Sequence, residues 1–266
     1  MSAQTSKNPT SKAIASPVPV RLYDGATSSK VPPVVLYLRG RAFLDRDRGE
    51  AERPIACAMA EMGAVVLEAD YGTISHNVFP QAMECAFQAL TDIAGRRKEF
   101  GASVKSPLFV AGDEAGGNVA AGVALKARDL LPGELKGQML FSPMVDPQMA
   151  TPSFRAADSL GMREAWSDGW SHYIGSFLQH PYAAPCLCSR LFNVAPALII
   201  TSQDDPLHDE VLDYAARLKT CQVAVTQHVF AIDCGWTSIY KQGTGRWVPS
   251  FQAEIAQFMK NASRAV

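Results

Sequence analysis

The chain of 266 residues has no apolar run close to the roughly 18 residues that a membrane-spanning helix needs, so we expect no membrane insertion. It also lacks an excess of charge of either sign. The formal net charge of −1 argues against a protein that tracks the phosphates of nucleic acids or binds anionic membranes. Residues 1–17 are polar and lack the apolar centre of a signal peptide, which predicts a cytoplasmic protein with a flexible N-terminal tail.

Cysteine is scarce as well. The chain has six cysteines, which fit a reducing compartment better than a disulfide framework. Cys186 and Cys188 are close in sequence, but their spacing does not match the common zinc-binding patterns. We therefore expect no metal site, and no motif in the sequence indicates another cofactor.

Short apolar runs rich in β-branched residues alternate with segments of helical periodicity. Several runs are apolar throughout, as expected when helices cover both faces of a parallel sheet. The pattern predicts an α/β protein with a doubly wound, mostly parallel sheet flanked by helices. The expected strands are 18–23, 33–38, 64–69, 107–111, 137–141, 195–202 and 223–230, and the expected helices are 50–62, 80–98, 115–129, 162–178, 207–219 and 249–261.

The segment 146–190 departs from this alternation. It is rich in Trp, His, Pro and Met and contains no clear strand. We expect it to form an inserted lid or a wall of a pocket. Phe43, Trp166, Trp170, Tyr173 and Trp236 are the aromatic candidates for contact with a ligand, although aromatic residues at helical spacing more often belong to a core.

The stretch LFVAGDEAGGNVAAGVAL, residues 108–125, combines a predicted strand, a Gly-Asp pair and a Gly-rich helix start. This is the outline of a nucleophile elbow, a sharp strand-to-helix turn that lifts a catalytic side chain above a sheet. Such a turn should carry Ser, Cys or Asp, whereas Glu114 stands here. The position predicts either altered chemistry or a frame that no longer catalyses a reaction.

Seven segments, in chain order, resemble the α/β-hydrolase fold-3 group, the hormone-sensitive-lipase-like esterases and deacetylases. VVLYLRGRAF is similar to the strand that leads into that group's His-Gly-Gly-Gly-Phe loop, and VAGDEAGGN is similar to its Gly-Asp-Ser-Ala-Gly-Gly-Asn elbow. The resemblance implies one α/β-hydrolase domain over residues 18–266, with most of the group's N-terminal helical cap missing. The other matching segments are ADYGTISHNVFP, FSPMVD, HPYAAP, TSQDDPL and DCGW.

Two of the three catalytic positions implied by this resemblance carry unusual residues. Glu114 stands where the group has its serine nucleophile, and Cys234 stands where it has its histidine. Asp205 matches the acid of the triad, and it can equally anchor a loop or cap the helix that follows. A thiol does not relay protons near neutral pH as an imidazole does, so the serine mechanism has no general base here.

The loop that supplies oxyanion donors in the group is also changed. Arg39, Gly40, Arg41 and Ala42 stand where the group has His-Gly-Gly-Gly, which should restrict the loop and crowd the pocket. Two guanidinium groups near Glu114 leave two arrangements open. In one, Arg39 or Arg41 pairs internally with the Glu114 carboxylate, or one of them is simply solvated. In the other, the two form a pocket for a carboxylate or phosphate ligand. We favour the internal pair.

Glu114 itself has two possible placements. Its carboxylate can fold back onto the oxyanion donors, including the N–H of Ala115, because a helix N-terminus favours an anion. Alternatively it attacks a substrate as a nucleophile, although its oxygens would overshoot the position of a serine oxygen by on the order of 1 Å. We favour the first placement, in which the site is closed by its own side chain.

Three functions remain open at this point. The first is a pseudo-hydrolase that binds a small molecule, which can be anionic, without cleaving it, as plant gibberellin receptors with this likeness do. The second is a repurposed lyase, dehydratase or isomerase in which Glu114 acts as the acid–base group. The third is a weak carboxylester hydrolase that uses Glu114 as its nucleophile or activates a water molecule. Members of the group often dimerise, so a homodimer also remains open.

Overall fold

The computed structural model describes an eight-stranded sheet whose strands run in the order β1-β2-β4-β3-β5-β6-β7-β8. The pairings β1–β2 and β2–β4 are antiparallel, and every other neighbouring pair is parallel. The strands are β1 Thr10–Ile14, β2 Val20–Asp24, β3 Val34–Leu38, β4 Val65–Ala69, β5 Leu108–Asp113, β6 Leu135–Phe141, β7 Ala197–Ser202 and β8 Val225–Phe230. The described residues are 10–14, 18–25, 29–44, 53–72, 78–177 and 180–264.

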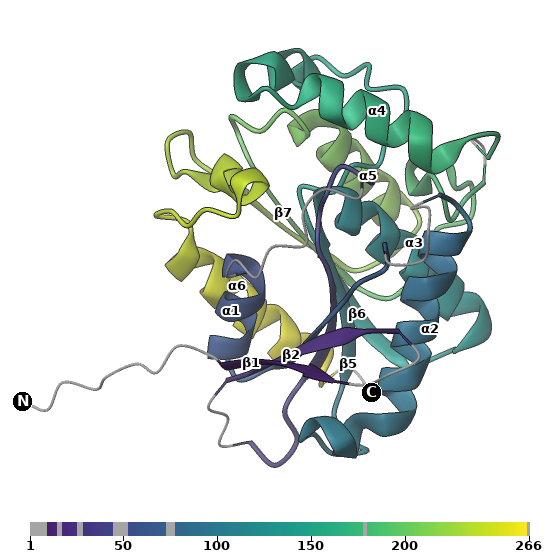
Figure 1. Ribbon diagram of the computed structural model, residues 1–266, viewed down its shortest axis with the longest axis vertical. Coiled ribbons are helices and arrows are strands. Elements are labelled where there is room, and N and C mark those ends of the chain that lie inside the picture. Colours follow the sequence, from purple (N-terminus) through teal and green to yellow (C-terminus); the bar gives the residue numbers. More distant parts are fainter. Residues whose placement is uncertain are drawn as a thin grey trace, which may run out of the picture.

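Helices cover both faces of this sheet (Figure 1). On one face lie α1 (Pro54–Glu61) and α6 (Val248–Ala262), which share an apolar cluster with alternate residues of the central strands. On the other face lie α2 (Gln81–Arg96), α3 (Glu114–Leu130) and α5 (His208–Thr220). No helix within the described ranges is long and apolar enough to cross a membrane.

The predicted fold class is confirmed, since the chain forms a mostly parallel sheet with helices on both sides, as expected for a doubly wound α/β protein. All seven expected strands and all six expected helices are present, with ends that shift by a few residues. The helix expected over 50–62 begins at Pro54, where the fixed backbone angle of proline suits the first helical position. Residues 50–52 lie outside the described part of the chain.

The sequence analysis did not predict one of the strands. Residues 10–14, expected within a flexible tail over 1–17, pair with β2 as an antiparallel edge strand. The sequence Thr-Ser-Lys-Ala-Ile carries little apolar signal, because an edge strand contributes mainly backbone hydrogen bonds and needs few buried side chains. The remainder of that tail, residues 1–9 and 15–17, lies outside the described residues.

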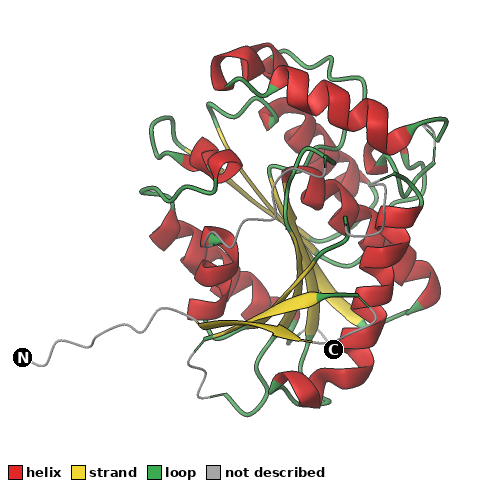
Figure 2. Cartoon of the chain, viewed as in Figure 1, coloured by secondary structure: helices red, strands yellow, loops and turns green. Residues whose placement is uncertain are grey.

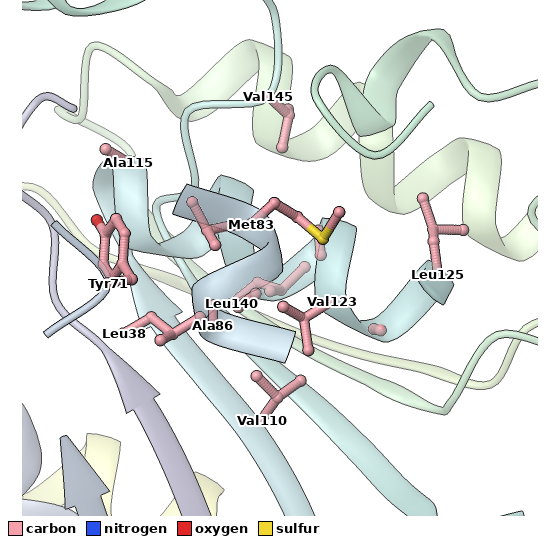
Figure 3. Packing of buried hydrophobic residues seen from close by; sticks show 14 of the residues in the cluster. Leu38, Tyr71, Met83, Ala86, Val110, Ala115, Val123, Leu125, Leu140 and Val145 are labelled. Atoms are coloured by element: carbon pink, nitrogen blue, oxygen red, sulfur yellow. The ribbon is translucent and has the colours of Figure 1, made fainter. Parts of the chain in front are cut away.

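The largest apolar cluster lies between the sheet and the helices α2 and α3 (Figure 3). Met83 and Ala86 of α2 and Val123 of α3 pack toward Val110 and Leu140 of the central strands. Helix α3 is rich in alanine and glycine and therefore comes very close to the strands. A Cβ atom at Gly116 would lie 2.0 Å from the carbonyl oxygen of Leu38, so this crossing requires glycine. The close contact holds the first turn of α3 directly beside the end of β3.

The segment 146–190 contains no strand among its described residues. It forms the 3₁₀ helices η2 (Ser153–Leu160) and η3 (Pro185–Leu187) and the helix α4 (Arg163–Ile174). Helix α4 lies across the top of the molecule in Figures 1 and 2, beyond the carboxyl ends of the parallel strands. This is the edge of the sheet where α/β proteins place their ligands.

Candidate functional site

The turn between β5 and α3 carries Glu114 in a strained backbone conformation. Its φ is +51°, a left-handed value that costs a non-glycine residue energy and is typical of functional turns. Asp113 ends the strand and Glu114 begins the helix, so the turn contains no spare residue. The N–H of Met144, from the loop after β6, donates to the carbonyl of Glu114 at 2.9 Å and braces the turn from the neighbouring strand.

The Glu114 carboxylate is buried, with 4% of the residue exposed, and both oxygens accept hydrogen bonds. Oε2 accepts from the backbone N–H of Ala42 at 2.9 Å, and Oε1 accepts from the indole N–H of Trp166 at 2.5 Å. Burial raises the pKa of Glu114 to about 7, and the charge of Asp113 adds to this rise. The donors Trp166, Ala42 and Ala115 oppose the rise because they stabilise the ionised form.

The loop that follows β3 presents its backbone to this carboxylate. Ala42 has a φ of +50° and Phe43 a φ of +54°, which are left-handed values at positions where the sequence has no glycine. A Cβ atom at Gly40 would lie 2.6 Å from Glu114 Oε2, so that position tolerates only glycine. The Gly40 N–H donates to Asp113 at 3.1 Å, which ties the loop to the end of β5.

The predicted pairing of Arg39 or Arg41 with Glu114 is wrong. Arg41 forms an ion pair with Asp70 instead, with 2.7 Å between Nη2 and Oδ1. Tyr71 donates its hydroxyl to the backbone carbonyl of Arg39 at 2.7 Å, and the Arg39 side chain lines a cavity with that of Arg41. The reason is the direction of the loop, since its N–H groups face the elbow while its guanidinium groups extend toward β2 and β4.

Asp205 lies at the end of β7 within a buried polar cluster. Its Oδ2 accepts from the hydroxyl of Ser142 at 2.6 Å, and its Oδ1 accepts from the hydroxyl of Tyr240 at 2.7 Å. The same Oδ1 accepts the backbone N–H of Leu207 at 2.8 Å, which anchors the loop before α5. Burial raises the pKa of Asp205, and these three donors oppose the rise.

Cys234 follows β8 in the turn that leads to the 3₁₀ helix η4 (Trp236–Lys241). Within the described chain, no hydrogen bond joins Cys234 to Asp205 or to Glu114. The Asp205 carboxylate meets the phenol of Tyr240 instead, and the Tyr240 ring packs edge-on against Trp166 with 5.2 Å between ring centroids. Burial raises the pKa of Tyr240 far above its ordinary value, so this phenol cannot serve as a base near neutral pH.

Four of the five histidines lie in the described part of the chain, and none of them contacts Glu114. His228 pairs with Glu254, and His208 pairs with Asp209. His180 packs against Phe79, and His172 is exposed on α4. The remaining residue, His76, lies outside the described ranges. The described part of the site therefore contains a buried carboxyl group without an imidazole beside it.

Helix α4 covers the elbow with a row of aromatic side chains. Trp166, Trp170 and Tyr173 share one face of the helix and are at most 2% exposed. Phe43 stacks on Tyr173 with 4.1 Å between ring centroids and packs against Trp170 at 4.8 Å. Three of the five aromatic residues predicted to contact a ligand, Phe43, Trp170 and Tyr173, thus pack against one another. Trp166 lies on the same face of α4, but its ring packs against Phe154 and Tyr240.

The fifth predicted residue, Trp236, lies elsewhere. It packs with Phe230, Trp247 and Phe251 on the side of the sheet that α6 covers. Its indole N–H donates to the hydroxyl of Ser142 at 2.8 Å, so it supports the polar cluster around Asp205. Trp236 therefore has a structural place and does not join the aromatic row of α4.

Three residues of the site had no clear signal in the sequence. Ser142 follows β6 and Tyr240 lies on η4, and both donate to Asp205, but nothing in the sequence marks either of them as its polar partner. Gly169 brings α4 into direct contact with the loop after β3, since a Cβ atom there would lie 1.7 Å from the Ala42 carbonyl oxygen. A glycine inside a predicted helix is the one hint of such a close approach.

Comparison with known proteins places the chain in a family. Residues 35–232 match the family model described as alpha/beta hydrolase fold, so the chain belongs to this family. The predicted likeness to its esterase group is confirmed. Esterase LipI of Mycobacterium tuberculosis is 30% identical over 223 residues, which cover 80% of this chain and 69% of that protein.

Two further similarities bear on function. A thermostable esterase from Pseudomonas putida has a solved structure with a TM-score of 0.77 and 28% identity, and the match covers 98% of this chain and 83% of that one. Gibberellin receptor GID1B of Arabidopsis thaliana is 26% identical over 208 residues, covering 73% of this chain and 57% of the receptor. The family thus includes relatives named as esterases and a relative named as a receptor.

The contact between α4 and the loop after β3 can be tested with a matched pair of glycine substitutions. Gly169→Ala forces a methyl group into the Ala42 carbonyl and should lower the free energy of unfolding by about 1–3 kcal/mol. Gly95→Ala in α2 meets nothing within 4 Å and should stabilise the protein by up to about 1 kcal/mol through helix propensity. Urea unfolding followed by circular dichroism measures both values. Equal effects of the two substitutions would contradict the close contact.

Proposed function

We propose that this protein is a non-hydrolytic member of the esterase family that binds a small molecule. The supporting observation is that the Glu114 carboxylate accepts the N–H of Ala42 and the indole N–H of Trp166. Ala42 belongs to the loop that, by the resemblance, would supply the oxyanion donors of an esterase. Both N–H groups therefore already donate hydrogen bonds to Glu114. A substrate carbonyl would have to displace a buried anion before any backbone N–H group could polarise it.

The rest of the site supports the same proposal. Acyl transfer requires a nucleophile, a base that takes its proton and an acid that orients the base. Here the orienting acid, Asp205, holds the hydroxyl groups of Ser142 and Tyr240, and neither can accept a proton near neutral pH. Glu114 as a nucleophile would need to leave both of its donors. The mixed anhydride that acyl transfer to its carboxylate would form, with loss of the alcohol, would then lack a base to activate water for its hydrolysis.

Two buried polar atoms support a role in binding. The indole N–H of Trp170 and the hydroxyl of Tyr173 have no hydrogen-bond partner among the described residues. Leaving such a group unsatisfied costs about 1–3 kcal/mol, so a molecule with a hydrogen-bond acceptor would gain from meeting them. Both lie on the face of α4 beside Phe43, whose ring would pack against the apolar part of that molecule. The receptor among the relatives is in keeping with this role.

A second candidate function is general acid–base catalysis by Glu114 in a lyase, dehydratase or isomerase. The pKa of about 7 favours it, because a group that titrates near neutral pH can both donate and accept a proton. The geometry favours it less, since both carboxylate oxygens are occupied and the residue is almost fully buried. Weak ester hydrolysis through Glu114 is the third alternative and requires the largest rearrangement.

The loss of hydrolysis is tested with p-nitrophenyl acetate. We expect the purified wild-type protein to show no turnover beyond that of Glu114→Gln, because the elbow carboxylate has no base beside it and blocks the oxyanion donors. Release of p-nitrophenol is followed at pH 7 to 8, and a related serine esterase serves as the positive control. Turnover by the wild-type protein that falls at least about tenfold in Glu114→Gln would contradict the proposal and support Glu114 as a nucleophile.

The binding role of Tyr173 is tested with two Tyr→Phe variants. Tyr173→Phe removes an unpartnered hydroxyl and should leave the unfolding free energy unchanged or higher. Tyr37→Phe is the matched control, because its hydroxyl donates to buried Asp113 at 2.6 Å and its loss should cost about 1–3 kcal/mol. Chemical unfolding measures both. An equal loss in the two variants would show that Tyr173 already has a structural partner and would remove this support for ligand binding.

A further inference from the structure

An open pocket of about 400 Å³ lies at the amino ends of the parallel strands β3, β5 and β6. This is the end of the sheet opposite the one that α4 covers in Figure 1. The six residues of β5 separate the pocket from Glu114, which places the two about 20 Å apart. Sites for small molecules commonly have volumes of about 300–1,000 Å³, so the pocket is large enough for such a ligand.

The pocket has more positive than negative side chains. Arg97, Lys105 and Lys136 line it, and Glu134 supplies the one carboxylate of the described lining. Arg97 donates to this carboxylate and to the backbone carbonyl of Ala94. Lys105 is exposed and Lys136 is half-buried, and within the described ranges neither pairs with a carboxylate. The described lining therefore keeps an excess of two positive charges after Arg97 has been paired.

The buried polar groups of the lining offer donors. Arg97 is 9% exposed, and its guanidinium has five N–H groups, of which Ala94 and Glu134 each accept one. Ser106 is 3% exposed, and its hydroxyl accepts the N–H of Ser103 at 3.1 Å. That hydroxyl donates to no acceptor in the part of the chain that the structure describes, so its hydrogen is free for a ligand. A molecule whose polar atoms only accept hydrogen bonds suits this lining.

Two exposed apolar side chains border these donors. Val31 is 40% exposed and Val104 is 64% exposed, and both line the pocket. Val104 directly precedes Lys105, so an apolar and a cationic side chain lie next to each other at the pocket. An apolar group attached to a bound anion would cover these valines and remove their surface from water.

We propose that this pocket binds a small phosphate monoester that carries an apolar group, with the phosphate held by Arg97, Ser106, Lys105 and Lys136. A phosphate monoester has a charge of about −1.5 to −2 at pH 7, which matches the excess in the lining. The oxygens of its dianion accept hydrogen bonds only, and ammonium, guanidinium and hydroxyl groups all donate to them. The site goes beyond the proposed function. It lies at the other end of the sheet from Glu114, so failure of one proposal leaves the other standing.

The experiment is a calorimetric titration of the full chain with inorganic phosphate and with phenyl phosphate at pH 7. Sodium chloride at matched ionic strength controls for general screening. We expect saturable binding of both, with phenyl phosphate bound at least about threefold more tightly because its ring covers the valines. Val104→Ser should reduce this difference between the two ligands, and the exposure of Val104 makes the substitution compatible with folding.

The role of the charges is tested with a matched set of lysine variants. Lys136→Gln should weaken the binding of both phosphates at least about fivefold, whereas Lys136→Arg keeps the charge and should change it less than about twofold. Lys241→Gln makes the same change in net charge at an exposed position of η4, beyond the carboxyl end of β8, and should bind as the wild-type protein does. The thermal midpoint of each ligand-free variant reports whether it folds. Lys105→Gln, at an exposed position, repeats the test if Lys136→Gln unfolds.

Several outcomes would overturn the proposal. The first is an absence of saturable phosphate binding by the folded wild-type protein. The second is equal weakening in Lys136→Gln and Lys241→Gln, which would show a general attraction between charges without a site. The third is a preference for phenyl phosphate that is absent or unchanged in Val104→Ser. The fourth is binding to phosphatidylcholine vesicles that contain phosphatidate without binding of phenyl phosphate, which would assign these side chains to a lipid surface.

Discussion

The hydrogen bonds from the Ala42 N–H and the Trp166 indole to the Glu114 carboxylate are the interaction on which the rest of the site depends. They join three parts of the chain that are distant in sequence: the loop after β3, the turn before α3 and the helix α4. Each part is otherwise held by strained backbone or by a close glycine contact. An apolar side chain at position 114 would leave these buried donors unsatisfied, and an ionised carboxylate without them could not remain buried.

Burial and hydrogen bonding act in opposite directions on the pKa of Glu114. The carboxyl group is therefore enclosed by its donors and still changes its protonation state near neutral pH. Burial opposes the charge, whereas three donors favour it, and the result is a pKa of about 7. The buried Asp205 carboxylate likewise accepts hydrogen bonds from three donors, the hydroxyls of Ser142 and Tyr240 and the N–H of Leu207. The carboxyl groups of Glu114 and Asp205 therefore both hold parts of the structure together. Among the described residues, no histidine contacts either carboxyl group.

Most of the fold could be predicted from the sequence, because both faces of the central strands are buried and their apolar runs are unbroken. The position of Glu114 in a strand-to-helix turn could be predicted from the Gly-Asp and Gly-Gly pairs around it. The partners of its carboxylate could not. Arginine neighbours in sequence suggested an ion pair, but backbone direction sends Arg41 to Asp70 and leaves the N–H of Ala42 facing Glu114. Likewise, Tyr240 reaches Asp205 only because η4 folds back over the end of β7.

The most direct test of this account is a titration of the Glu114 side-chain carboxyl carbon by ¹³C NMR, together with the Trp166 indole proton. The account predicts one shared midpoint near pH 7, with the indole proton moving downfield as the carboxyl group ionises and its hydrogen bond strengthens. The indole transition should vanish in Glu114→Gln. Two results would contradict the claim that Glu114 is buried and hydrogen-bonded to Trp166. One is a carboxyl midpoint in the ordinary range of a solvent-exposed glutamate, and the other is an indole proton whose chemical shift does not change as the carboxyl group titrates.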